Sequence, residues 1–383
     1  MVLKVAERGA VPAFIVMDVM RDANAREAAG EHVLHMEVGQ PSTPAPQGVL
    51  DAARDALKTD KLGYTDAFGI PPLRSRIARH YTEQYGVAVD PARVVTTTGS
   101  SGGFVLAFLS AFEAGDRVAL AAPGYPCYRN ILAALGCEPI PLLVGPETDY
   151  QPTPEILDAI DGPLDGLIIA SPSNPTGTMI PAEDLKELVA YCDARSIRLI
   201  SDEIYHGITF GEPAHSALEF TDNAIVINSF SKYFSMTGWR LGWMVIPQDL
   251  ARSIECLAQN LFISPPTLSQ MAGIAAFECR AEMDLNVAKY ARNRTLLLKE
   301  LPKAGFHKLS RAEGAFYLYA DVAHLTNDSL AFSKRMLAET GVAATPGIDF
   351  DADRGHRYMR FSFARATEDM AEAAVRLQEW LGG

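Results

Sequence analysis

The chain has few cysteines for its length. Its 383 residues include five, and no two of them form a CxxC motif. An odd number of scattered cysteines predicts neither a disulfide framework nor a zinc site, and it indicates free thiols in a reducing compartment. The five are Cys127, Cys137, Cys192, Cys256 and Cys279. Cys127 lies close to a motif described below, and we interpret it as a packing residue.

Positive charge and long apolar runs are also scarce. The chain carries 34 Lys and Arg against 47 Asp and Glu, which gives a net charge of −13 with both signs interspersed. This balance disfavours nucleic acid or an anionic membrane as the main partner. Charged residues such as Lys4, Arg8 and Asp18 interrupt the N-terminal apolar runs, a pattern typical neither of a signal peptide nor of a membrane span. We therefore expect a cytoplasmic protein.

Strand-like and helix-like segments alternate between residues 93 and 246. The predicted strands are 93–98, 117–122, 166–171, 197–201, 224–228 and 240–246, and the predicted helices are 101–112, 125–135 and 181–194. Several of these strands are continuous apolar runs, as expected for strands that are buried on both faces. The alternation predicts an α/β fold, with a mostly parallel sheet that helices flank on both faces.

The pattern changes after about residue 280. A long helical stretch over 282–301 precedes predicted strands at 314–321 and 358–363 and predicted helices at 330–340 and 368–381. These elements predict a smaller α+β domain, and we expect the N-terminal residues to pack against it. The predicted division is therefore 49–280 for the large domain, and 1–48 with 281–383 for the small one.

Polar motifs follow most of the predicted strands. Ligands of parallel α/β folds bind at the carboxyl ends of the strands, so these motifs are where chemistry is expected. They are Gly99-Ser100, Pro123–Tyr125, Ser171–Asn174, Asp202–Tyr205 and Ser229–Lys232. Together they offer a lysine, a carboxylate, hydroxyl groups and a glycine-rich turn.

Lys232 is the candidate nucleophile. It comes soon after the apolar run 224–228 and lies between Ser231 and Tyr233. A lysine amine in such a place can attack the aldehyde of pyridoxal phosphate (PLP) to give an imine, and then yield that imine to the amino group of a substrate. A solvated surface lysine is the alternative for this residue taken alone, and the neighbouring motifs favour the catalytic interpretation.

Four residues suit the ring of PLP. The carboxylate of Asp202 can pair with the pyridine nitrogen and keep it protonated, although a turn is the usual role of an aspartate after a strand. Asn174 and Tyr205 each offer a donor for the ring hydroxyl, while Asn174-Pro175 is also an ordinary turn sequence. Tyr125 can stack on the ring, with a core or turn aromatic as the alternative.

The phosphate of PLP needs donors and positive charge. The turn that contains Ser100, Ser101 and Gly102 precedes or opens a predicted helix, where backbone amides bind anions. Arg240 can grip two phosphate oxygens, and the hydroxyls of Ser229 and Ser231 can add hydrogen bonds.

Arg360 lies within the apolar strand predicted at 358–363. A buried arginine is costly unless it is paired. One suitable partner is the α-carboxylate of an amino acid, held by two hydrogen bonds, and a structural ion pair is the alternative.

These motifs resemble those of the class I and II aminotransferases, in the aspartate-aminotransferase-like group of fold type I PLP enzymes. The resemblance runs nearly end to end, and the motif around Lys232 and Arg240 is specific. The matching positions are Gly39-Gln40-Pro41, Tyr64, Gly99–Gly102, Asn174–Gly177, Asp202–Tyr205, Ser229–Lys232, Arg240 and Arg360. The resemblance implies a PLP-dependent aminotransferase that moves an amino group between an L-amino acid and a 2-oxo acid by a ping-pong mechanism.

The same resemblance implies a homodimer with its active sites at the interface. Tyr64 resembles the tyrosine that such enzymes lend to the phosphate of the neighbouring subunit. Gly39 resembles the glycine whose backbone contacts the substrate carboxylate, and Asn174 and Arg360 complete the implied substrate-binding set.

Two sequence features bear on the substrate. Some aspartate-specific relatives carry a lysine after the glycine of the phosphate loop, whereas this chain has Ser100-Ser101-Gly102, which disfavours a distal carboxylate. Residues 12–20 resemble the segment that folds over the site in relatives. Phe14, Ile15, Val16 and Met17 there favour a neutral or hydrophobic side chain, although a buried helix would show the same pattern.

Two other functions use the same residues. A C–S β-lyase or related PLP lyase would release pyruvate and ammonia from cystathionine without a keto-acid acceptor. A non-enzymatic PLP-binding sensor module would carry an added DNA-binding domain, which we do not expect because only about 40 residues precede Gly39 and the chain is acidic.

Overall fold

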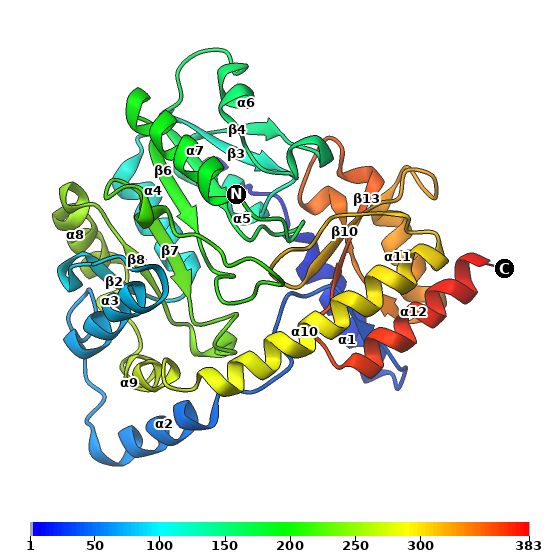
Figure 1. Cartoon of the computed structure of the whole chain (residues 1–383), viewed down its shortest axis with the longest axis horizontal. Helices are drawn as coiled ribbons and strands as arrows, with labels where there is room; N and C mark the ends of the chain where they lie inside the picture. The colour runs from blue at the N-terminus through cyan, green and yellow to red at the C-terminus, as the bar shows by residue number, and fades with distance from the viewer. Residues whose placement is uncertain (1–2, 383) are drawn as a thin grey trace.

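A seven-stranded sheet forms the centre of the computed structural model, which describes residues 3–382 (Figure 1). Its strand order is β2-β8-β7-β6-β5-β3-β4. β8 is antiparallel to both of its neighbours, and the other adjacent pairs are parallel. The strands are β2 (Val94–Thr97), β3 (Arg117–Ala122), β4 (Glu138–Leu143), β5 (Gly166–Ala170), β6 (Arg198–Asp202), β7 (Ile225–Ser229) and β8 (Gly242–Val245). The predicted α/β fold class is confirmed.

Helices cover both faces of this sheet. In β5, Leu167 and Ile169 face one apolar layer and Ile168 faces the other, because side chains alternate along a strand. The first layer contains α2 (Gln47–Thr59), α3 (Pro71–Tyr85), α6 (Pro154–Asp158), α7 (Ala182–Arg195) and α9 (Thr267–Ala276). The second contains α4 (Ser100–Ala111), α5 (Pro126–Leu135) and α8 (Ala251–Leu261). The sheet is therefore buried on both sides, as its apolar strands predict.

A smaller unit follows in the chain. It has a four-stranded antiparallel sheet in the order β12-β13-β10-β9 and its own apolar core. The long helix α10 leads from the large unit into this small one (Figure 1). The elements are β9 (Lys308–Leu309), β10 (Tyr317–Asp321), β12 (Thr345–Pro346), β13 (Tyr358–Ser362), α10 (Arg280–Glu300), α11 (Ser329–Thr340) and α12 (Thr367–Gly382).

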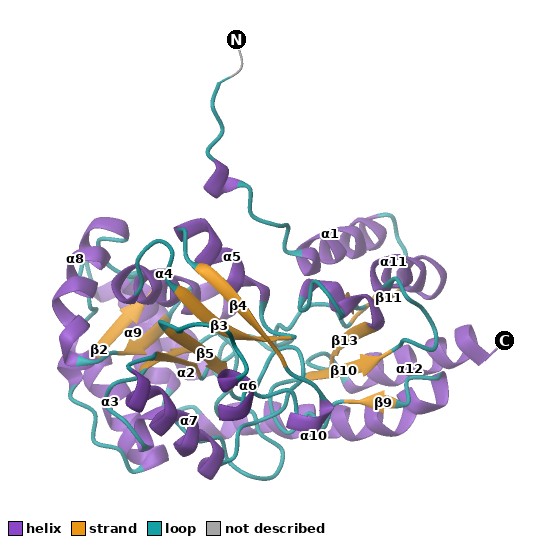
Figure 2. Ribbon diagram, turned by 90° about the horizontal axis from the view of Figure 1, so that it is seen from above, coloured by secondary structure: helices purple, strands orange, loops and turns teal. Residues whose placement is uncertain are grey.

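The N-terminal segment contributes to the small unit. Helix α1 (Ile15–Ala28) contacts β11 (Val342–Ala343) and β12, and β1 (Leu34–His35) pairs in parallel with β11. The short helix η1 (Glu7–Gly9) contacts α5, and the preceding segment, residues 3–6, extends away from the rest of the molecule (Figure 2). Its Leu3 and Val5 are more than four-fifths exposed, at 81% and 83%. The start of α1 nevertheless lies at the active site described below.

Several elements differ from the sequence-based expectation, among them helices α2, α3, α8 and α9, which were not predicted, and two strands. Strand β4 was not predicted, because Pro139 and Pro141 interrupt its apolar pattern; it lies at the sheet edge and pairs only with β3, where proline is tolerated. Strand β10 begins at Tyr317 rather than at Gly314, because Ala312 and Ala315 have φ values of 48° and 57° that turn the chain. Within residues 3–382, no helix combines the length and apolar character needed to cross a membrane.

Candidate active site

A cavity of about 180 Å³ lies where the carboxyl ends of the large sheet face the small unit and the start of α1. Most of the predicted site residues line it together, although they come from distant parts of the chain. They are Gly39, Ser100, Ser101, Tyr125, Asn174, Asp202, Tyr205, Ser231, Lys232, Arg240 and Arg360. The sheet edge thus gathers the polar motifs at one place.

Three predicted residues lie outside the lining of this cavity. Gly102 sits in the first turn of α4, one residue beyond Ser101. Ser229 is buried, and its Oγ lies within hydrogen-bond distance of the Leu241 carbonyl at 3.1 Å and of Ser231 Oγ at 3.0 Å, while it accepts from the Ser231 amide at 3.1 Å. Tyr64 is 86% exposed on the surface of the monomer. Ser229 therefore orients Ser231 in this structure, and Tyr64 contributes nothing to the cavity of its own chain.

Lys232 projects into the cavity from the turn after β7. Its Nζ donates to the Gly39 carbonyl at 2.6 Å, and its neighbours include the rings of Tyr205 and Phe316. Burial is the largest cause that lowers the pKa of Lys232, and together with the nearby guanidinium groups of Arg360 and Arg240 it brings that pKa to about 8, against the opposing effect of Asp202. A larger fraction of this amine is therefore neutral at pH 7 than for an ordinary lysine.

Asp202 ends β6 and is fully enclosed. Tyr128 donates its hydroxyl to Asp202 Oδ2, and the Ile204 amide donates to Oδ1 at 3.1 Å. Burial raises the pKa of Asp202 to about 6, although these two hydrogen bonds and Lys232 favour the charged form. Asp202 has no ion-pair partner within 4 Å among residues 3–382, so the site presents a buried acceptor that is suited to a cationic ring N–H.

The turn between β2 and α4 forms a cradle with Arg240. Gly99 has a φ of 79°, and a Cβ atom there would lie 2.5 Å from Arg240 Nη2. Only glycine therefore allows the guanidinium to approach the first turn of α4, whose amides have no helical acceptors. Arg240 Nη1 donates to the Thr237 carbonyl at 3.1 Å, and Arg240 has no carboxylate partner in the part of the chain that the structure describes. The cradle suits a phosphate dianion.

Arg360 comes from β13 of the small unit and is only 2% exposed. Its Nη1 donates to Asn174 Oδ1 at 2.8 Å, and its Nη2 donates to Thr345 Oγ1 at 3.1 Å and to the Glu37 carbonyl. The guanidinium carbon lies 4.4 Å from the ring centre of Tyr317. No carboxylate pairs with Arg360 within residues 3–382, so this buried cation is available to a carboxylate ligand.

Apolar side chains close the cavity beside Arg360. Phe14, Val16 and Met17 from the start of α1 line it, as do Val38 and Ile204. Phe14 packs edge-on against Tyr125, with ring centres 5.7 Å apart. Ile15, which the sequence placed in the same group, packs instead beside Val19 and Ala23 on the other side of α1.

Several residues of the site have no clear signal in the sequence or only a weak one. Tyr128 lies one helical turn after Tyr125, so its spacing from Tyr125 was a usable signal. Tyr317 donates to or accepts from Tyr205 through their hydroxyls at 2.6 Å, across 112 residues of chain. Thr345 accepts a hydrogen bond from Arg360. No local sequence pattern around Tyr317 or Thr345 indicates these contacts.

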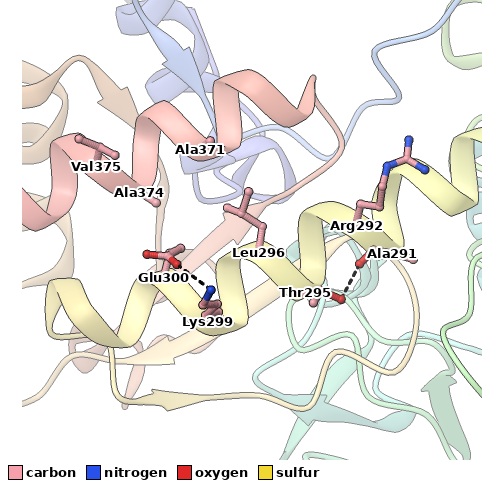
Figure 3. Close-up of a pocket in the computed structure, with 9 residues that line it drawn as sticks. All are labelled: Ala291, Arg292, Thr295, Leu296, Lys299, Glu300, Ala371, Ala374 and Val375. Carbon is pink, nitrogen blue, oxygen red and sulfur yellow. Dashed lines mark hydrogen bonds and ion pairs between the residues drawn. The ribbon is translucent and has the colours of Figure 1, made fainter.

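A larger hollow of about 710 Å³ lies elsewhere, on the outside of the small unit between α10 and α12 (Figure 3). Its lining is mainly aliphatic and includes Leu296, Ala374 and Val375. Lys299 lies 3.9 Å from Glu300, and Arg292 points away from the other labelled side chains. Since no reactive groups converge there, we place the chemistry in the smaller cavity.

The buried lysine and the buried aspartate, with a phosphate cradle at the strand ends, define a fold type I PLP enzyme. Comparison with known proteins gives the family: the model of the class I and II aminotransferases matches residues 31–377. Valine–pyruvate aminotransferase of Mycobacterium tuberculosis is 53% identical over 382 residues, which cover 99% of this chain and 98% of that protein. The chain belongs to the class I and II aminotransferases and is a PLP-dependent transaminase.

Solved structures agree with this assignment. An aminotransferase from Mycobacterium tuberculosis superposes with a TM-score of 0.98 at 51% identity, over 100% of both chains. Aspartate aminotransferase from Thermus thermophilus, with maleate, gives a TM-score of 0.93 at 29% identity, over 99% of this chain and 100% of that one. The lyase alternative receives no support from these relatives.

Proposed function

We propose that this transaminase takes the amino group of a small aliphatic L-amino acid, with valine as the representative, and passes it to pyruvate by a ping-pong mechanism. The observation that carries the proposal is the apolar lining of Phe14, Val16, Met17, Val38 and Ile204 beside Arg360. Branched aliphatic side chains gain free energy from such cover, at roughly 0.8 kcal/mol per buried methylene.

The charges of the cavity support the same substrate class. Its cationic lining residues are Lys232, Arg240 and Arg360, and we assign one to the cofactor carbon, one to the phosphate and one to the α-carboxylate. That assignment leaves no cation within the described lining for a second carboxylate, such as that of aspartate. The 53% identical relative is named valine–pyruvate aminotransferase, whereas the aspartate aminotransferases are about 30% identical or less over similar lengths.

We assign the roles of the cofactor side as follows. When bound, PLP supplies an aldehyde for amino groups and a ring that withdraws electrons from the reacting carbon. Lys232 would hold the aldehyde carbon of the bound cofactor, and its Nζ, once released by the substrate amine, would act as the base that takes the α-proton of the substrate and as the acid that returns it to the cofactor carbon. Asp202, oriented by Tyr128, holds a proton on the ring nitrogen. Tyr205 and Asn174 donate to the ring hydroxyl.

The remaining residues bind and orient. Arg240, Ser231 and the first amides of α4, from Ser100 to Gly102, hold the phosphate, while Tyr125 stacks on the ring. Arg360 holds the α-carboxylate, next to the backbone of Gly39. Fixing the carboxylate fixes the direction of the α C–H bond relative to Lys232.

A donor panel tests the proposal. Purified enzyme loaded with PLP is assayed with pyruvate as the acceptor and with one donor at a time. The donors are valine, leucine, phenylalanine, aspartate and lysine. We expect kcat/KM for valine to exceed that for aspartate by at least about 100-fold, since a second carboxylate would be buried without a partner. A preference for aspartate would contradict the proposal. Release of ammonia from cystathionine without pyruvate serves as the control for lyase activity.

We further propose a cytoplasmic homodimer in which Tyr64 reaches the phosphate of the partner subunit. Support comes from the 86% exposure of Tyr64 and from the five unpaired cysteines. We also propose that residues 49–280 and the unit formed by 1–48 and 281–383 close on one another when substrate binds. Tyr64→Phe should weaken PLP binding in a dimer, and sedimentation that shows a fully active monomer would contradict this arrangement.

A further inference from the structure

Helix α1 begins without a cap of its own. The residue before it is Phe14, whose side chain has no atom that could accept the amide hydrogens of the first turn. Asp349, more than 300 residues away in sequence, fills this role. Its Oδ1 accepts from the Ile15 amide at 3.1 Å, and its Oδ2 accepts from the Val16 amide at 3.0 Å. The side chain of Asp349 is 1% exposed, so the contact is enclosed.

The position of this carboxylate is fixed by both units of the molecule. Asp349 closely follows β12, whose Thr345 pairs in register with Arg360. Its main-chain carbonyl accepts from Arg129 Nη2 of α5 at 2.6 Å. The next carbonyl, that of Phe350, accepts from the Gly124 amide at 3.0 Å. Asp349 is therefore tied to the arginine that we assign to the substrate and to the turn that carries Tyr125.

The contact decides where the apolar lining lies. It holds the two amides that immediately follow Phe14, and Phe14 rests edge-on against Tyr125. Val16 and Met17, in the same turn, also line the cavity. The side chain of Ile15 faces the other way, toward Val19 and Ala23. A shift of this turn would therefore move the apolar lining away from Arg360 and leave the cofactor side in place.

We propose that Asp349 is the positioning residue that sets side-chain specificity, because its carboxylate holds the start of α1 over the side chain of the substrate. This inference rests on the proposed preference for aliphatic donors and names the residue that produces it. Asp349 itself is not among the residues that line the cavity. It acts through Phe14, Val16 and Met17.

The test compares two donors in the first half of the reaction. The PLP-loaded enzyme is mixed with valine or alanine, and the change in cofactor absorbance gives a limiting rate and a saturation constant for each. In Asp349→Asn, which keeps the shape but loses the charge and one acceptor, we expect the saturation constant for valine to rise about tenfold, because its two extra methyl groups lose their cover. The saturation constant for alanine should change less than about threefold, and the limiting rates for both donors should stay the same.

Asp328→Asn is the matched control. Asp328 caps α11 in the same unit, where its side chain accepts from the Ala331 amide at 3.0 Å, and it lies outside the cavity lining. This variant should leave the ratio of the two saturation constants unchanged. Equal effects of Asp349→Asn on valine and alanine, or an effect on the limiting rate alone, would show that Asp349 has a merely structural role and would overturn the proposal.

A second pair of variants changes Ile15, the helix partner in the hydrogen bond to Asp349. This pair keeps the test decisive if Asp349→Asn does not fold. Ile15→Pro removes the amide hydrogen that Asp349 Oδ1 accepts, and proline is tolerated in the first position of a helix. Ile15→Val shortens the side chain and keeps the amide. We expect a selective loss for valine in Ile15→Pro and not in Ile15→Val. The same result in both would contradict the proposed role of the hydrogen bond.

Failure of the proposed function looks different. A wild-type enzyme that prefers aspartate to valine would refute the aliphatic preference before any variant is made. A wild-type enzyme that prefers valine, with a valine-to-alanine ratio that Asp349→Asn leaves unchanged, would keep the function and refute the role of Asp349.

Discussion

The two sides of the active site are built in different ways. On the cofactor side, Lys232, Asp202 and the Gly99 turn lie at the ends of β7, β6 and β2 of one sheet, so the sheet itself sets their spacing. On the substrate side, Arg360, the start of α1 and the residues near Gly39 come from three separate segments held by side-chain hydrogen bonds. A rigid sheet edge suits chemistry that all donors share. A lining assembled from separable segments can change with the donor.

The largest expected effect is on the cofactor side. Lys232→Ala removes the group that we assign to hold the cofactor and to move the α-proton, so turnover with any donor should fall by roughly 10⁴-fold or more. The phosphate cradle remains, and PLP should still bind. Turnover and cofactor absorbance after dialysis check this. Lys186→Ala, on the exposed surface of α7, is the control. Retention of more than a tenth of the activity would remove Lys232 from the mechanism.

The next largest effects are expected from Arg360 and Arg240, which we assign to different ligands. Arg360→Lys keeps the charge but loses the two-pronged grip on a carboxylate, and we expect KM for valine to rise about 100-fold with unchanged PLP affinity. Arg240→Lys should do the reverse, weakening PLP binding while excess PLP restores turnover. PLP titrations and donor saturation curves separate the two. If both variants weaken PLP alone, the assignment of Arg360 to the substrate carboxylate is wrong.

A smaller effect is expected from Tyr128→Phe. The hydroxyl of Tyr128 donates to Asp202, and removal of a hydrogen bond to a charged group costs about 1.5–3 kcal/mol. We expect kcat to fall about tenfold or somewhat more for valine and alanine alike, because Asp202 serves every donor. Tyr150→Phe is a matched control, because Tyr150 is buried in the first apolar layer, where it packs edge-on against Tyr319, and does not line the cavity. Selective loss of one donor would place Tyr128 on the substrate side.

The smallest expected effect is on the pH dependence of PLP capture. It depends on the pKa of Lys232, which Arg360 on the substrate side helps to lower. Because burial and the nearby arginines lower that pKa to about 8, the neutral amine is lost as pH falls below 8. The rate at which the enzyme without cofactor captures added PLP should therefore rise about tenfold between pH 6 and 7, and level off above about 8. Arg360→Gln removes one of the charges that lower the pKa, so the levelling point should move to higher pH.

The outcome of the capture experiment is read from the shape of the profile. A rate that continues to rise up to pH 10 in the wild type would mean that Lys232 has the pKa of an ordinary lysine. An unchanged profile in Arg360→Gln would show that the substrate-side charge does not act on the cofactor-side amine.

The sequence predicts that the polar residues assigned to the cofactor gather in one place, and it does so for a physical reason. Lys232, Asp202 and Asn174 come directly or shortly after apolar strands, and parallel strands bring their carboxyl ends to one edge. Arg360 was found because a charged residue within an apolar strand is unusual. The alternation of elements likewise predicts the large sheet, while the proline-rich edge strand β4 escapes detection.

The substrate side depends on contacts between residues far apart in the chain, which no local sequence pattern predicts. Tyr317 meets Tyr205 across 112 residues, and Asp349 meets Ile15 across 334. In sequence, Asp349 is an aspartate in a short turn like many others. The apolar character of residues 14–17 was visible, but the division of that turn between the cavity and the outer face of α1 required the structure.

One titration tests the central claim most directly. The purified enzyme with PLP is titrated with valine while its absorbance is recorded, and pyruvate is then added. We predict that the visible band of the lysine-bound cofactor converts to the pyridoxamine form with valine and returns with pyruvate, whereas aspartate gives little conversion at the same concentration. A band that valine and the other amino acids leave unchanged would contradict the account of this site as a transaminase for aliphatic amino acids.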